Sequence, residues 1–217
     1  MELQVLEKVK DIISVDKYQF LKEAEEYGLS QSHLIEACRD PKHYHKLEKF
    51  LEKNAKLTST YCAASGASTA LGGFTTSIAL AGVDLANMAA QLYRFNQKVA
   101  ITHGYSLSNT HEIDKSNMIF LKALGFETAA RTAIMGSVAK AAAENTAKKG
   151  VASAPAIRLI MEVTKLLGLK TTKTQAAKMV PFAGAFLGGG LNYMFATSAT
   201  KNIIKEYKIE LSDRRAI

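Results

Sequence analysis

Two long stretches of the chain contain no charged residue, and they constrain the fold more than any other feature. The first extends from Leu57 to Val83 and the second from Met179 to Thr200. Each reaches the roughly 20 residues that an α-helix needs to cross a bilayer. Both are rich in Gly, Ala, Ser and Thr rather than in large aliphatic side chains. We therefore expect two long helices that pack closely, either in a protein core or against lipid.

Glycines recur inside both stretches and are the expected packing positions: Gly72 and Gly73 in the first, Gly184 and Gly188 in the second. The second pair forms a GxxxG pattern, which lets two helix backbones approach closely. Asn192 lies one further step along the same face. We expect its amide to hydrogen bond across to the first stretch. A polar lining for a pore or crevice is the other interpretation.

The remainder of the chain also favours helix. Strand-forming alternation is nearly absent, Ala and Leu are plentiful, and the three prolines lie far apart. Apolar spacing predicts a helix over 2–27 and a shorter one over 155–167. The residues placed to begin or end helices are Gly28, Asp40, Gly104, Asn109 and Gly168. Thr172 and Gln175 suggest a further capped start. We predict an all-α protein, a single compact multi-helix domain built around the two Gly/Ala-rich helices.

The composition divides this domain into three parts without a linker. Residues 1–55 form an amphipathic helical region, residues 56–208 carry both charge-free stretches, and residues 209–217 form a charged tail.

The charge balance indicates an anionic partner. The net charge is +8 and the pI is near 9.4, and acidic residues are sparse from Lys140 to Lys205. No zinc-finger spacing or aromatic stacking platform accompanies this charge, so nucleic acid is not the expected partner. The expected partner is an anionic membrane surface or a membrane protein. Cys38 and Cys62 form no CxxC motif and the N-terminus has no signal-peptide core, so we expect a cytoplasmic protein.

Two segments together resemble the EcsC family. The first is GGFTTSIALAGVDLANMAAQLYRFNQKVAITHGYS (72–106), and the second is VPFAGAFLGGGLNY (180–193). The positions that carry the resemblance are Gly72, Gly73, Asp84, Gln91, Arg94, Gly104, Tyr105, Pro181, Gly184, Gly188 and Asn192. The resemblance covers about residues 56–208. It implies an all-helical bacterial protein without an agreed activity, peripheral to or inserted in the inner membrane.

Asp84, Gln91 and Arg94 fall on one face of a helix, with Tyr105 just beyond its end. They either line a polar cleft or make contacts where helices cross. We favour interhelical contacts, because buried charges persist mainly when they are paired.

Other catalytic and ligand-binding patterns find little support. His43 and His45 diverge on a helix, so we expect no metal site. Neither a GxSxG elbow nor a phosphate-binding glycine loop is present, and we expect no cofactor. Ser137 and Lys140 spell SxxK, without an accompanying motif.

Three functions remain open at this point. The first is a non-enzymatic, membrane-associated accessory or interaction protein at the cytoplasmic face of the membrane. The second is a membrane-perturbing effector or toxin that uses the glycine-rich helices. The third is a hydrolase with a cleft around Asp84, Arg94 and Tyr105.

Overall fold

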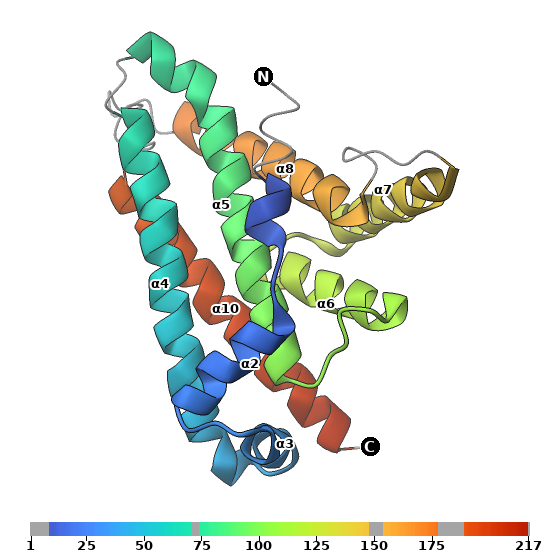
Figure 1. Cartoon of the computed structure of the whole chain (residues 1–217). Coiled ribbons are helices and arrows are strands. Elements are labelled where there is room, and N and C mark those ends of the chain that lie inside the picture. Colours follow the sequence, from blue (N-terminus) through green and yellow to red (C-terminus); the bar gives the residue numbers. More distant parts are fainter. Residues whose placement is uncertain (1–8, 71–73, 148–153, 178–188, 217) are drawn as a thin grey trace.

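The computed structural model describes residues 9–70, 74–147, 154–177 and 189–216. Every regular element among them is helical, which confirms the all-α prediction (Figure 1). The elements are α2 (Lys17–Glu26), α3 (Gln31–Arg39), the 3-10 turn η1 (Pro41–His43), α4 (Tyr44–Ala70), α5 (Phe74–Thr102), α6 (Thr110–Ala123), α7 (Thr128–Ala147), α8 (Pro155–Ala177) and α10 (Gly189–Arg215).

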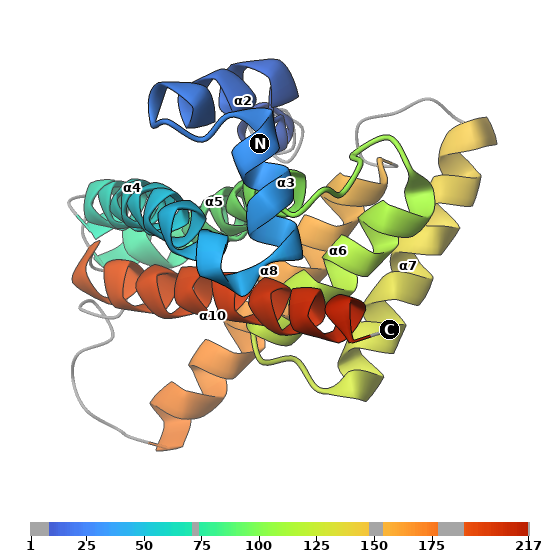
Figure 2. The same cartoon turned by 90° about the horizontal axis from the view of Figure 1, so that it is seen from below.

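The centre of the molecule is a three-helix unit of α4, α5 and α10. The most extensive helix packing in the protein is that of α10 on α4, followed by that of α4 on α5. Two contacts show that α4 and α10 are antiparallel. Lys208 Nζ lies 2.9 Å from Glu48 Oε1 at one end, and Asn192 Nδ2 lies 3.4 Å from the Cys62 carbonyl oxygen at the other. Seen from below, α2 and α10 lie on opposite sides of the α4–α5 pair (Figure 2).

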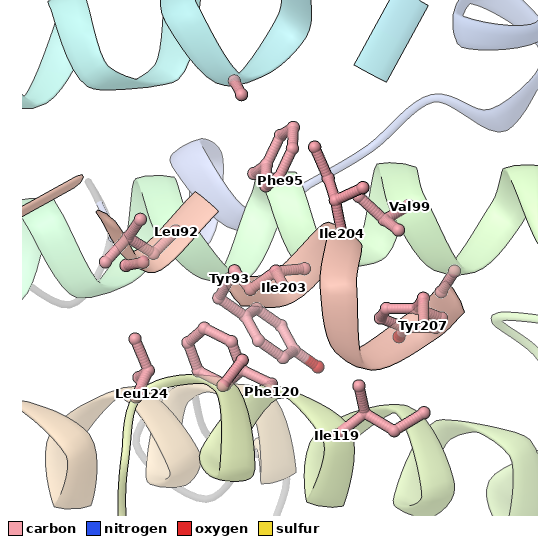
Figure 3. Close-up of a cluster of buried hydrophobic side chains, with 14 of the residues drawn as sticks. Leu92, Tyr93, Phe95, Val99, Ile119, Phe120, Leu124, Ile203, Ile204 and Tyr207 are labelled. Atoms are coloured by element: carbon pink, nitrogen blue, oxygen red, sulfur yellow. The ribbon is translucent and has the colours of Figure 1, made fainter. Parts of the chain in front are cut away.

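A second group of helices covers the other side of α5. Helix α8 packs on α5, α7 packs on α8, and α6 packs on α10. Where α5, α6 and α10 meet, their apolar side chains interdigitate in a dry cluster (Figure 3). Tyr93 and Phe120 stack edge to face there, with ring centroids 5.5 Å apart. Burial of this kind of surface contributes about 25 cal/mol per Å² and is the main source of stability.

The N-terminal region departs from the expected single helix over 2–27. Residues 9–13 are helical, but the chain leaves the helix at 14–16 before α2 begins. The Asp16 carboxylate accepts a hydrogen bond of 3.0 Å from the Gln19 backbone N–H and so caps a new helix. An N-cap needs a non-helical backbone, which a continuous helix would not allow.

Most of the predicted helix boundaries are confirmed. Gly28 and Gly104 follow α2 and α5 with φ of +85° and +82°, a conformation that other residues rarely adopt. Asp40 caps η1, and the Asn109 side chain accepts hydrogen bonds from the first backbone N–H groups of α6. Glu112 does not complete a capping box with Asn109, because its carboxylate accepts from the Ser106 N–H instead.

The prediction that Gly168 ends a helix is wrong. It lies inside α8, which continues to Ala177 and thus passes through Thr172 and Gln175, where a new helix was expected. A Cβ added at Gly168 would lie 3.7 Å from Leu85 Cδ1 of α5, an ordinary contact. This glycine therefore lies at a helix–helix contact without a left-handed backbone.

The boundaries expected at residues 55/56 and 208/209 fall inside α4 and α10. Neither boundary coincides with the end of a helix.

Two glycines give a matched test of the helix ends. Gly104 has a left-handed backbone, whereas Gly136 lies within α7, and a Cβ at either would meet no atom within 4 Å. Gly104→Ala should lower the free energy of unfolding by about 1–2 kcal/mol. Gly136→Ala should raise it by up to about 1 kcal/mol, because alanine favours helix. Urea denaturation measures both, and equal effects would contradict the assigned role of Gly104.

Candidate functional site

A buried polar contact joins the three central helices. Asp84 on α5 is 2% exposed and Asn192 on α10 is 7% exposed. Asn192 Nδ2 donates a hydrogen bond of 2.7 Å to Asp84 Oδ2 and a longer one of 3.4 Å to the Cys62 carbonyl oxygen of α4. The Asn192 amide thus links the second charge-free stretch to Cys62 in the first stretch. It also links it to Asp84, the residue that directly follows the first stretch.

The thiol beside this contact is unsuited to nucleophilic chemistry. Cys62 is buried, and burial together with the nearby Asp84 raises the pKa of its thiol to about 12. Only the thiolate is an effective nucleophile. The Cys62 side chain therefore packs as a small apolar group.

The other expected site residues do not gather around Asp84. Gln91 and Arg94 follow it on the continuous helix α5, about 10 Å and 15 Å along the axis at 1.5 Å per residue. Both are partly exposed. Helix α5 ends at Thr102, about 27 Å along its axis from Asp84, and Tyr105 lies beyond this end. The structure thus brings Asp84 and Asn192 together and leaves Arg94 and Tyr105 elsewhere.

Tyr105 instead belongs to a second buried group, which we call the tyrosine–histidine cluster: Tyr44, His103, Tyr105 and Tyr207. The ring of Tyr207 lies 5.2 Å from that of His103 and 5.6 Å from that of Tyr105, centroid to centroid. The Tyr207 hydroxyl lies 2.7 Å from Ser116 Oγ of α6. The cluster thus joins the start of α4, the end of α5, and helices α6 and α10.

Two hydrogen bonds fix the tautomer of neutral His103. Its Nδ1 lies 2.8 Å from the Val99 carbonyl oxygen and its Nε2 lies 3.0 Å from the Tyr44 hydroxyl. A carbonyl only accepts, so in the neutral ring Nδ1 carries the proton and Nε2 accepts from Tyr44. Burial lowers the pKa of His103 to about 4, despite the opposing effect of the Val99 bond. The imidazole is neutral near pH 7 and enclosed by protein.

Two arginines at the end of α10 cap other helices. Arg215 donates to the Ala37 and Cys38 carbonyl oxygens at the end of α3, at 2.7 and 2.9 Å. Arg214 donates to the His103 carbonyl oxygen at 3.4 Å, and its guanidinium lies 5.0 Å from the centre of the Tyr105 ring. Cations near helix C-termini satisfy the last carbonyls and favourably oppose the helix dipole.

The structure engages Ser137 in a contact between helices. Its hydroxyl oxygen accepts a hydrogen bond of 2.7 Å from Arg158 Nε of α8, and Glu162 lies 3.4 Å away. Lys140 of the same SxxK pattern is exposed. Across the described ranges, no three His, Cys, Asp or Glu side chains group so that they could hold a metal ion.

A different feature emerges on the surface of α4 and α10. Five large apolar side chains are exposed there, which we call the apolar end: Leu57, Tyr61, Tyr193, Met194 and Phe195. Tyr61 is 58% exposed and Met194 is 67% exposed. Because α4 and α10 are antiparallel and Cys62 lies beside Asn192, all five lie near the N-terminal end of α10, beside the middle of α4.

Lysines follow the apolar end along both helices. This lysine belt consists of Lys53, Lys56, Lys201 and Lys205, all exposed. In residues 53–64 of α4 and 189–205 of α10 they are the only charged residues. Within the described part of the chain, no carboxylate forms an ion pair with Lys56, Lys201 or Lys205. The exposed surface thus changes from basic to apolar in the same direction on both helices.

Two other predictions concern the membrane. Gly72, Gly73, Gly184 and Gly188 lie outside the described residues, so their packing role stays a prediction. Among the helices that the structure describes, none combines the length and the apolar character needed to cross a bilayer.

Sequence reasoning did not find the tyrosine–histidine cluster. His103 stands out only as the residue before the Gly104–Tyr105 pair, and Tyr44 lies 59 residues earlier in the chain. The only local signal in the sequence was a histidine next to a glycine that ends a helix.

Comparison with known proteins gives one match. The family model described as the EcsC protein family matches residues 3–209. This range includes the N-terminal 55 residues, where no motif carried the resemblance. No curated protein and no solved structure matches the chain.

The contact between Asn192 and Asp84 should be a major contributor to stability. Asn192→Ala removes the donor to a buried carboxyl group and should lower the free energy of unfolding by about 1–3 kcal/mol. Asn202→Ala is the control, since its longer bond of 3.3 Å to the Ala123 carbonyl oxygen is at the surface of the same helix. Its effect should stay below about 1 kcal/mol in urea denaturation. Equal losses would contradict the proposed importance of the buried contact.

His103 should make stability depend on pH. Its pKa is about 4 in the folded protein against 6.5 for a free side chain, so the unfolded chain binds more protons between these values. The stability that neutral His103 contributes is present above pH 6.5 and lost as pH falls toward 4, by about 3 kcal/mol in total.

His103→Gln should flatten this dependence, whatever its effect on stability at neutral pH. The control is His111→Gln, at an exposed position of α6, which should leave the dependence as it is. Urea denaturation at a series of pH values measures the slopes. If His103→Gln keeps the wild-type slope, His103 is not the group responsible.

Proposed function

Because this chain belongs to the EcsC protein family, we propose that it is a non-enzymatic, membrane-associated helical protein, an accessory or interaction protein at the cytoplasmic face of the membrane. The observation that carries this proposal is the apolar end of α4 and α10 together with the lysine belt behind it. Exposed apolar side chains beside a cluster of one charge are typical of surfaces that bind a membrane or a partner.

Physical chemistry favours a lipid surface as the site of attachment. Each lysine near an anionic leaflet contributes about 1 kcal/mol to binding. Tyrosine is enriched at membrane–water interfaces, where its ring lies in the apolar boundary and its hydroxyl stays hydrated. Tyr61 and Tyr193 are both exposed at the apolar end. The net charge of +8 adds long-range attraction to the same surface.

The buried groups support a non-enzymatic role. The neutral His103 is enclosed by aromatic rings, and the Cys62 thiol stays protonated. Asp84, the carboxyl group proposed for a hydrolase cleft, contacts Asn192 and lies about 27 Å along α5 from the helix end that precedes Tyr105. These contacts stabilise the helix packing.

A membrane-perturbing effector is the second candidate, favoured by one observation. The residues of the apolar end lie within the two charge-free stretches, and the rest of both stretches could follow them into lipid. Attachment and permeabilisation differ in a direct assay, because only the second releases a dye from vesicles.

The test combines cell fractionation with vesicle binding. The full-length protein expressed in bacteria should sediment with membranes at low salt and be released by a high-salt wash, because salt screens exposed charges. The purified protein should bind vesicles of bacterial polar lipids without releasing a trapped dye. Recovery in the soluble fraction at low salt, with no vesicle binding, would contradict membrane association. Binding with dye release would favour the effector instead.

A further inference from the structure

The described surface carries enough information to orient the protein on a membrane. We infer that the apolar end docks on the bilayer interface while the lysine belt binds the phosphate groups of anionic lipids. This inference rests on the proposed membrane association and adds the lipid class and the face that docks.

The two groups lie close enough to contact one lipid surface together. Along α4, Tyr61 lies two turns beyond Lys53, about 12 Å at the helical rise. Along α10, Met194 lies about 10 Å from Lys201. Helix α4 continues past Tyr61 to Ala70, so the lipid surface would lie along the helix pair and not across its tip. The apolar side chains would enter the headgroup boundary, and the long lysine side chains beside them would extend to the phosphates.

Lys201 and Lys205 of the lysine belt are placed to meet phosphate. Met194, Ser198, Lys201 and Lys205 succeed one another at four- and three-residue intervals, so they share the exposed face of α10. The first negatively charged residue after them on α10 is Glu206, which pairs with Lys122 of α6. An anionic headgroup near Lys201 and Lys205 would not compete with a salt bridge observed in the described part of the chain.

The N-terminal helices carry the opposite charge balance. Residues 9–40, which include α2 and α3, contain seven acidic and four basic residues. This segment packs beside the first half of α4, where Phe20 contacts Phe50. Like charge repels an anionic surface, so the protein should approach with the lysine belt first.

The absence of tryptophan in the sequence allows a direct test of this orientation. The variants Leu57→Trp and Met194→Trp each place a single fluorophore at the apolar end. Tyr18→Trp and Ile35→Trp place it on α2 and α3, at positions that are 81% and 47% exposed. Vesicles of phosphatidylcholine with one quarter phosphatidylglycerol should shift the emission of the first pair to the blue. A lipid carrying a bromine or spin-label quencher in its acyl chain should quench the same two variants only.

Substitutions that each remove one positive charge test whether the lipids must be anionic. Lys201→Gln with Lys205→Gln should weaken binding to these vesicles about thirtyfold, at about fivefold per lysine. Lys17→Gln with Lys22→Gln on α2 removes the same net charge and should weaken binding less than threefold. Binding of the wild type to vesicles of pure phosphatidylcholine should be weaker than that of the lysine variant to the mixed vesicles.

The outcomes separate this inference from the function on which it rests. If the protein binds the mixed vesicles but only Tyr18→Trp and Ile35→Trp respond, the orientation is wrong while membrane association stands. If the protein binds both lipid compositions equally, the role of anionic headgroups is wrong while the orientation stands. A blue shift of Met194→Trp that grows with protein concentration without vesicles would identify a second copy of the chain as the occupant. Failure to bind any vesicle removes both proposals.

Discussion

The packing of α10, antiparallel to α4 and parallel to α5, is the constraint on which the rest of the structure depends. It brings residues from the beginning, middle and end of the chain into one core, and polar contacts fix it at both ends. Asn192 bonds to Asp84 and Cys62 at one end, and Arg214 and Arg215 cap two other helices at the other end. A shift of α10 by one turn would break these contacts, and the loss of the hydrogen bonds of the buried Asn192 amide alone would cost about 1–3 kcal/mol.

The two polar groups inside the protein thus fix the alignment of the helices. Small and apolar side chains pack in several registers with similar energies, whereas a hydrogen bond in a low-dielectric core requires one geometry. The tyrosine–histidine cluster works in this way, because His103 binds Tyr44 of α4 through one nitrogen and the backbone of α5 through the other. The buried amide of Asn192 has the same role at the far end of α10.

The features that a single sequence predicted well are those decided by neighbouring residues. The all-α class follows from composition and spacing, and Gly28, Gly104, Asp40 and Asn109 act locally on the backbone. The prediction at Gly168 failed because a glycine at a helix–helix contact cannot be distinguished in a single sequence from a glycine that ends a helix. The partners of His103 and Arg215 lie 59 and more than 170 residues away, beyond the reach of any local pattern. Asp84 and Arg94 share a helix, but periodicity does not show that Asp84 meets the Asn192 side chain while Arg94 makes no such hydrogen bond in the described part of the chain.

The absence of charge at the apolar end requires a cause outside the protein core. Packing constrains buried positions such as Cys62 and Ala196, where a charge would be costly. It places no such limit on Leu57, Tyr61 and Met194, which are exposed and which lysine or glutamate could replace without disturbing the core. The same helices do carry charges at exposed positions a few turns away. Apolar side chains at unconstrained exposed positions, in the same place on two antiparallel helices, fit the proposed membrane attachment. A membrane interface bordered by anionic headgroups satisfies both the apolar end and the lysines behind it.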